Sequence, residues 1–118
     1  MKEDTRNEVE FRSVAMARYL PAMLKLLSHK GEQYAGKSEP ALINFYEGSE
    51  FSEQTPAHYL ISLATKQWHV ISNWAATDPE MKMVTKREVV QRIFDVCIYM
   101  MLLLFMIEND QKATLPGE

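Results

Sequence analysis

Asp95 is the residue that most suggests chemistry, because it lies in an otherwise apolar segment, residues 93–107. A carboxylate is rarely buried unless a cation, an ion pair or hydrogen bonds compensate it. On a helix, Glu88, Arg92, Asp95 and Tyr99 would share one face, because they are four, three and four residues apart. Either this stripe is a structural ladder of ion pairs closed by the Tyr99 hydroxyl, or it lines a pocket where Asp95 holds a cation or fixes a ligand-binding base.

A second polar stripe is expected on the preceding helix, where Ser62, Lys66, His69 and Asn73 repeat the same spacing. Lys66 and His69 can donate hydrogen bonds to a phosphate, and Asn73 can bind a donor or an acceptor edge. The alternative is a solvated outer face of that helix. A zinc site is not indicated, because His69 has no second His or Cys at ligand spacing.

A third group of candidates precedes these stripes. Lys30 and Tyr34 lie in a predicted loop, and Asn44 and Phe45 follow it. An amide beside an aromatic ring, after a loop that carries a lysine, can read the edge of a base and stack on it. The predicted ligand-binding set is therefore Lys30, Tyr34, Asn44, Lys66, His69, Arg92, Asp95 and Tyr99.

Acidic side chains three residues apart offer a different chemistry. Glu47, Glu50 and Glu53 follow this spacing, and Mg²⁺ prefers such oxygen ligands. Gly48 weakens a helix at this point, so the alternative is a solvated acidic loop. No Ser-His-Asp order, phosphate-binding glycine loop, zinc signature or dinucleotide fingerprint is present in the sequence.

Four helices are needed to position these residues. Apolar residues three or four apart predict them at about 7–28, 38–48, 56–76 and 86–108, with a loop at 29–37 and a turn at 77–80. Ser38 and Thr55 are the expected N-caps, Gly48 the expected end of the second helix, and Pro21 should kink or divide the first. The expected inward positions are Phe11, Val14, Ala15, Arg18 or Tyr19, Ala22 and Leu26 in the first helix, and Leu60, Leu63, Ala64, Trp68, Ile71 and Ala75 in the third.

The last helix is expected at the centre of the fold. Its C-terminal half is apolar nearly all round, which predicts burial on all sides, and a second subunit would help to provide it. The uncharged stretch 96–107 is shorter than the roughly 20 residues that a membrane span needs. The fold class predicted is therefore all-α: a bundle of about four helices in one domain, residues 1–118, with frayed ends at 1–6 and 109–118. We expect it to be a homo-oligomer.

The bulk composition narrows the setting. A length of 118 residues fits one domain with a real core, and the net charge of −3 argues against nonspecific binding of nucleic acid. The single cysteine, Cys97, allows no intrachain disulfide, and the start of the chain has no apolar signal segment. These features predict a cytoplasmic protein.

Five short motifs carry a resemblance to a known family: Lys30…Tyr34-Ala35, Ala41…Asn44-Phe45, Thr55-Pro56…Leu60, Lys66 and Arg92…Asp95…Tyr99. Their succession resembles small phage-encoded helical proteins related to the MazG-like, all-α nucleoside triphosphate pyrophosphohydrolases. The resemblance covers about residues 30–107. It implies an oligomeric helical bundle that holds a nucleotide between helices. Catalytic members bind magnesium with a Glu-Glu-x-x-Glu and a Glu-x-x-Asp run. This chain lacks the first, and the second reads Arg92-Ile93-Phe94-Asp95, so that only Asp95 carries over and Arg92 would repel the metal.

Three functions follow as hypotheses. The first is a phage-type protein that binds a nucleotide or nucleotide signal without efficient catalysis and could sequester a host signalling nucleotide. The second is a non-enzymatic interaction module that acts on a host protein. The third is a divergent pyrophosphohydrolase, in which Glu47, Glu50, Glu88 and Asp95 would hold Mg²⁺. No cofactor is expected outside the third hypothesis, and neither a membrane nor nucleic acid is an expected partner.

Overall fold

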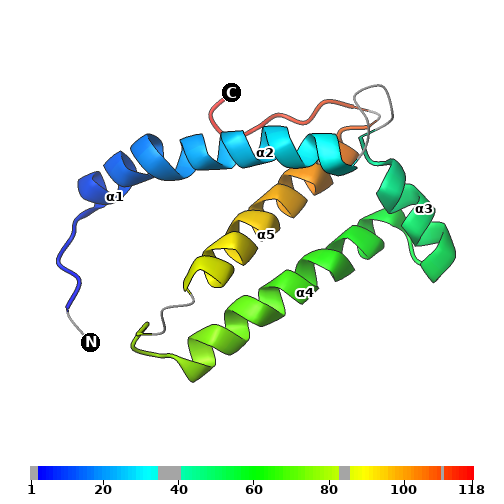
Figure 1. The fold of residues 1–118 in the computed structure, drawn as a ribbon. Helices are drawn as coiled ribbons and strands as arrows, with labels where there is room; N and C mark the ends of the chain where they lie inside the picture. Colours follow the sequence, from blue (N-terminus) through cyan, green and yellow to red (C-terminus); the bar gives the residue numbers. More distant parts are fainter. Residues whose placement is uncertain (1–2, 35–40, 83–85, 110) are drawn as a thin grey trace.

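The structure is a computed structural model that describes residues 3–34, 41–82, 86–109 and 111–118. These residues form helices and irregular segments without a strand, which confirms the all-α class. The elements are α1 (Glu8–Val14), the π-helical η1 (Ala15–Tyr19), α2 (Leu20–Tyr34), α3 (Ile43–Ser52), α4 (Pro56–Thr77) and α5 (Lys86–Ile107). Because α1, η1 and α2 follow one another without a break, they form one helix, called helix 8–34 below, and the described residues contain four helices in all (Figure 1).

Helix 8–34 begins where the sequence predicts. The Asn7 side chain caps it by accepting a hydrogen bond of 2.9 Å from the backbone N–H of Glu10. The predicted end at Ser28 is wrong, since the helix continues to Tyr34. One glycine in a helix, here Gly31, costs only about 1 kcal/mol and does not end it. Ser38, the expected cap of the next helix, lies outside the described residues, and the predicted start of that helix is wrong, since residues 41–42 form a turn and α3 begins at Ile43.

Pro21 neither breaks nor divides helix 8–34. Instead, the turn before it widens into the π-helix, in which the N–H of Leu20 reaches back five residues to the carbonyl oxygen of Ala15. A proline cannot donate, and a π-turn is a common way to absorb such a defect. The extra residue changes which positions are shielded: Ala22 is exposed, against expectation, and the half-buried side chains after the π-turn are Met23, Leu26 and Leu27.

Gly48 does not end α3, as the sequence predicted, but lies inside it. The helix ends at Ser52, and the following Glu53 adopts a left-handed conformation with φ of 57°. A Cβ atom at position 48 would lie 2.5 Å from the Cε2 and Cζ atoms of Tyr59 on α4. Glycine therefore allows α3 and α4 to pack closely, a role that the sequence pattern does not distinguish from a C-cap.

α4 starts as predicted and differs on its inward face. Thr55 Oγ1 accepts a hydrogen bond from the N–H of His58 at 3.2 Å, and Pro56 occupies the first turn. Leu60 and Ala64 are buried, but Trp68, expected inside, is 58% exposed; Ala75 is also exposed. α3 and α5 are the described elements that pack extensively on α4, and neither covers Trp68.

The buried core lies where α3, α4 and the C-terminal half of α5 meet. Phe45 and Tyr99 form an edge-to-face pair at its centre, with ring centroids 6.3 Å apart and planes at 81°. The buried residues of this core are Leu42, Phe45, Leu60, Ala64 and Tyr99. Figure 1 shows α5 between α4 and helix 8–34. α5 comes near helix 8–34 at the C-terminal end of helix 8–34.

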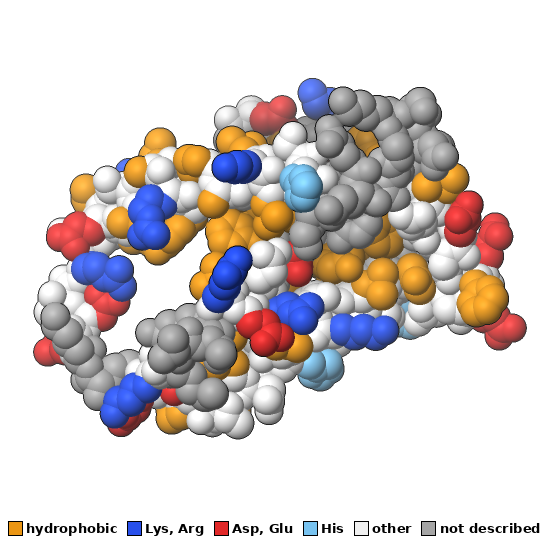
Figure 2. Space-filling view, in the orientation of Figure 1, with side chains coloured by type: hydrophobic (Ala, Val, Ile, Leu, Met, Phe, Trp, Pro, Cys, Tyr) orange, Lys and Arg blue, Asp and Glu red, His pale blue; other side chains and the backbone are white. Residues whose placement is uncertain are grey.

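The chain is more extended than a compact domain of its size. Its radius of gyration is 16.9 Å, whereas a compact chain of this length would have about 13.5 Å. The difference arises mainly from helix 8–34, whose N-terminal half projects from the other helices (Figure 1). Figure 2 shows the molecule hollowed through between this projecting half and the remainder of the chain.

Candidate functional site

Asp95 is buried, as its sequence context suggested, but its described partner differs from the expected one. The side chain is 8% exposed, and Oδ1 accepts a hydrogen bond of 3.2 Å from Gln91 Nε2. Arg92 pairs with Glu88 at 3.5 Å and donates from Nη1 to Gln67 Oε1 on α4 at 2.7 Å. Among the interactions of the described residues, an Arg92–Asp95 pair is not found, and the buried Nε of Arg92 has no partner there. The first step of the ladder thus forms, and Arg92 then links α5 to α4.

The aromatic and amide candidates whose side chains the structure describes, Tyr99 and Asn44, lie in different surroundings. Tyr99 is 9% exposed and packs on Phe45, so that its ring belongs to the core. Asn44 is exposed on α3. Lys30 and Tyr34 lie in the last turns of α2, and their side chains lie outside the described part of the chain.

The stripe on α4 lies on the outer face of the helix. Lys66, His69 and Asn73 are exposed, while Ser62 is half-buried and donates its hydroxyl to the carbonyl oxygen of His58 at 2.9 Å. This arrangement corresponds to the solvated-face alternative. It leaves Lys66 and His69 accessible to solutes without enclosing them.

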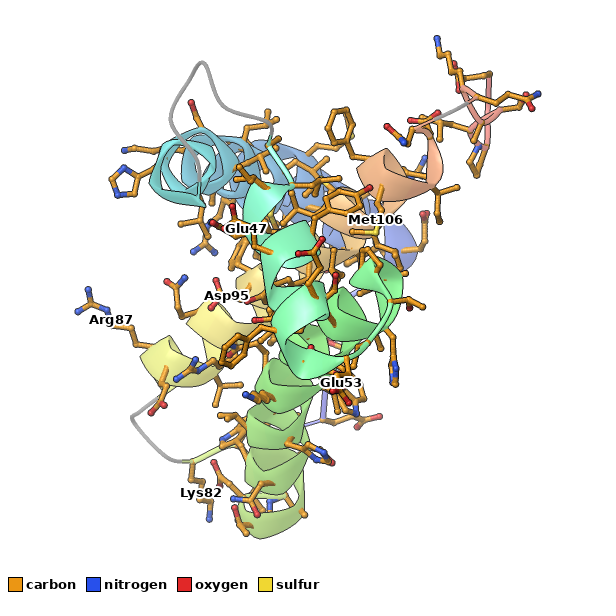
Figure 3. All side chains as sticks on the ribbon, turned by 90° about the vertical axis from the view of Figure 1, so that its right-hand side faces the viewer. Glu47, Glu53, Lys82, Arg87, Asp95 and Met106 are labelled. Carbon is orange, nitrogen blue, oxygen red and sulfur yellow. The ribbon has the colours of Figure 1, made fainter. Side chains whose placement is uncertain are left out.

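The acidic candidates are divided between two helices. Glu47 and Glu50 are exposed on α3, whereas Glu88 and Asp95 are on α5. Seven residues separate the latter two, which is about 10 Å along a helix axis. Figure 3 shows Glu47 and Asp95 on their separate helices. The residues that the structure describes contain no group of three His, Cys, Asp or Glu side chains placed to hold a metal ion.

A hollow of about 780 Å³ lies between α2 and the N-terminal half of α5. Figure 2 shows hydrophobic side chains between these two helices and cationic side chains on either side. A neighbouring depression of about 480 Å³ is lined by Arg87, Glu88, Gln91 and Arg92. Sequence reasoning missed this hollow, although four-residue spacing of Lys25 and His29 marks a common face of α2. Its lining residues are Ala22, Lys25, Leu26, His29, Arg87, Val90, Gln91 and Phe94.

Two helices, α5 and helix 8–34, expose many large apolar side chains to solvent. The expected burial of α5 on all sides is wrong for the single chain, because only a small share of the helix is covered. Its large exposed side chains are Val90, Ile93, Met100, Met101, Phe105 and Ile107. Those of helix 8–34 are Val9, Phe11, Met16, Tyr19, Leu20 and Leu24. We call these two sets the α5 face and the arm face.

The accessible surface quantifies the excess. The chain exposes 9397 Å², whereas a compact monomer of 13.7 kDa exposes about 6600 Å². The surplus is about 2800 Å². Apolar patches of several hundred Å² on a protein surface mark places where another molecule binds.

α5 also meets the length and composition of a membrane-crossing helix. The segment Arg87–Ile107 is the one such helix among the described residues, and it is weak evidence for a span. Two charged residues lie within this segment: Arg92, which links α5 to Gln67 on α4, and the buried Asp95, which bonds Gln91 of the same helix. A charge in the bilayer centre is costly, which favours cover by protein over cover by lipid.

Comparisons with known proteins do not assign this site. The MazG-like resemblance therefore stays a prediction, and the function rests on the geometry just described. No protein-family model, curated protein or solved structure matches the chain.

Proposed function

We propose that the protein is a non-enzymatic interaction module that assembles with a second copy of itself through the arm face and the α5 face. The observation that carries this proposal is the surplus of about 2800 Å² of accessible surface over a compact monomer. A folded chain gains by covering apolar surface, at about 25 cal/mol per Å². In the single chain, the arm face and the α5 face remain exposed to solvent.

The amount of surface favours a second copy as the partner. Obligate homodimers bury about 2000–5000 Å² in total and have apolar interfaces. Two chains together have a surplus of about 5600 Å², which exceeds this range, so covering about half of the surplus already gives an interface of that size. A two-fold arrangement would let the arm face of each copy cover the α5 face of the other. This pairing would complete the bundle that the sequence predicts.

The chemistry of the faces supports tight packing. The α5 face contains Met100 and Met101 beside Phe105, and flexible methionines fill irregular gaps at interfaces. The arm face offers Phe11 and Tyr19, the kind of aromatic residues that dominate binding energy in interfaces.

Light scattering after size-exclusion chromatography, with native mass spectrometry, tests this proposal. The wild type should have twice the mass of the chain. Leu20→Glu/Leu24→Glu should be monomeric, and should remain helical because both side chains are already exposed, at 56% and 66%. The control Ser72→Glu/Asn73→Glu adds the same charge at exposed polar positions of α4, outside both faces, and should stay dimeric.

Other results would show that a different molecule binds the two apolar faces. A wild-type chain that stays monomeric at high concentration contradicts self-assembly. If that monomer then sediments with phosphatidylcholine vesicles, α5 is covered by lipid, and if it does not, a different protein is the partner, as the host-protein hypothesis expects. Both outcomes reject a second copy.

Nucleotide binding is a second candidate, with a narrower basis. The depression beside Arg87 and Arg92 is cationic apart from Glu88, and guanidinium groups suit phosphate oxygens. Lys66 and His69 do not line it. A nucleotide panel in a thermal-shift assay would test it, and stabilisation should be lost in Arg92→Ala. A panel without any shift would reject it.

A further inference from the structure

We infer that the hollow between α2 and α5 binds a small organic anion, a phosphate or carboxylate carried on an apolar, ring-sized body. This site is separate from the arm face and the α5 face, apart from Val90, and does not depend on self-assembly. The inference rests on the volume of the hollow, the distribution of charge around it and the chemistry of its floor.

The size suits a small molecule. Ligand sites typically enclose about 300–1000 Å³ and combine an apolar lining with a few polar groups. At about 780 Å³ the hollow lies in this range, and its apolar members come from both helices: Ala22 and Leu26 from α2, Val90 and Phe94 from α5. Phe94 supplies a ring face or edge against which a flat body can pack.

The charge is of one sign. Lys25 and His29 line the hollow from α2 and Arg87 lines it from α5, whereas none of its lining residues is acidic. In a chain with a net charge of −3, the two cationic groups Lys25 and Arg87 make this lining locally positive, and the His29 imidazole adds a hydrogen-bonding group. Figure 3 shows Arg87 extending outward from the first turns of α5. A lining that combines cationic and apolar side chains selects a ligand with an anionic head and an apolar body.

Gln91 adds a fixed polar group to this lining. Its amide is oriented by the hydrogen bond from Nε2 to the buried Asp95. An amide held in one orientation can distinguish donors from acceptors on the ligand body, whereas a freely rotating amide cannot. Asp95 thus acts on the hollow as a positioning residue, through Gln91.

The probe is 1-naphthyl phosphate, compared with 1-naphthoate, inorganic phosphate and uncharged 1-naphthol. Titration followed by amide NMR should shift the signals of Val90 and Gln91 with the two anionic naphthyl compounds. Inorganic phosphate and naphthol should each bind at least tenfold more weakly, because inorganic phosphate lacks the apolar body and naphthol lacks the anionic head group. The relative affinities of the phosphate and the carboxylate identify the preferred head group.

Variants locate the binding. Lys25→Ala/Arg87→Ala should weaken naphthyl phosphate at least tenfold, and Val90→Glu should do so without loss of folding because Val90 is 47% exposed. The matched control Lys66→Ala/Lys112→Ala removes two exposed lysines outside the hollow and should bind as the wild type does. Far-ultraviolet circular dichroism and mass measurement on each variant separate a binding defect from unfolding or altered assembly.

Two results would overturn the inference. One is the absence of any amide shift at millimolar naphthyl phosphate while the variants and wild type are equally folded. The other is binding that the control variant weakens as much as Lys25→Ala/Arg87→Ala does, which would show a nonspecific response to surface charge. Either result leaves the proposed self-assembly unaffected, because that is judged from molecular mass alone.

Discussion

Replacing Gly48 by alanine should destabilise the protein, although alanine is the better helix former. In a helix interior the exchange gains about 0.5–1 kcal/mol. Here, however, the new Cβ would lie 2.5 Å from two ring carbons of Tyr59 and 2.7 Å from its hydroxyl. The atoms met are the outer end of the Tyr59 side chain, which packs against the buried core and would lose that contact if it moved aside, so overpacking of this kind costs about 1–3 kcal/mol. The expected balance is a loss of about 1 kcal/mol in the free energy of unfolding.

The experiment is a double-mutant cycle in urea, followed by circular dichroism. Gly48→Ala alone should lower the unfolding midpoint and the melting temperature, the latter by about 4 °C for 1 kcal/mol. In the background Tyr59→Ala the clash is removed, so the same exchange should stabilise the protein by about 0.5–1 kcal/mol. The change of sign isolates the contact. If Gly48→Ala is as stable as the wild type or more stable when Tyr59 is present, the close approach of α3 and α4 does not explain this glycine.

Three further predictions concern single side chains. Asp78 is buried and accepts hydrogen bonds from the indole of Trp74 and the N–H of Lys82, so Asp78→Ala should cost about 1–3 kcal/mol in urea unfolding; an unchanged midpoint would contradict a structural role. Glu53 is exposed with φ of 57°, so Glu53→Gly should stabilise the protein by about 0.5–1 kcal/mol, and a loss of stability would oppose this. The hydrogen bonds from Arg6 lower the pKa of the Asp4 carboxyl to about 2. Any stability from this pair is therefore present at neutral pH and lost as the pH falls through that value. The NMR titration of Asp4 should move up toward 3.8 in the variant R6Q, and a midpoint that stays near 2 would assign the shift to another cause.

Two helix starts could be predicted from the sequence because local chemistry determines them, whereas α3 begins at Ile43 and not at the predicted residue 38. Asn7 and Thr55 each cap the helix that follows, and both are recognisable without knowledge of the fold. The end of α3 could not be predicted in this way. Gly48 looks like a terminating residue, but its position is determined by Tyr59 on another helix, and Glu53, which does close the helix, is not a residue type expected there.

At the polar site around Asp95 and Arg92, too, one feature could be predicted from the sequence and another could not. The burial of Asp95 could be predicted from its apolar neighbours, whereas the partner of Arg92 could not. Gln67 is 25 residues away in sequence, and only the packing of α4 on α5 brings it within 2.7 Å. The hollow between α2 and α5 is likewise invisible in a linear pattern, because Lys25 and Arg87 come from helices that are distant in the chain.

The widened turn at residues 15–19 has a geometric consequence for the half-buried side chains of helix 8–34. A regular α-helix rotates by about 100° per residue, so Val14 and Leu26 would point about 120° apart. The extra residue in the widened turn takes up about 100° of that rotation and brings the two within about 20° of one another. Both are in fact half-buried. Deleting one residue from this widened turn would make the helix more regular, yet it would rotate the side chains of α1 by about 100° relative to those of α2. The two parts of the helix would then no longer present their shielded side chains on one side.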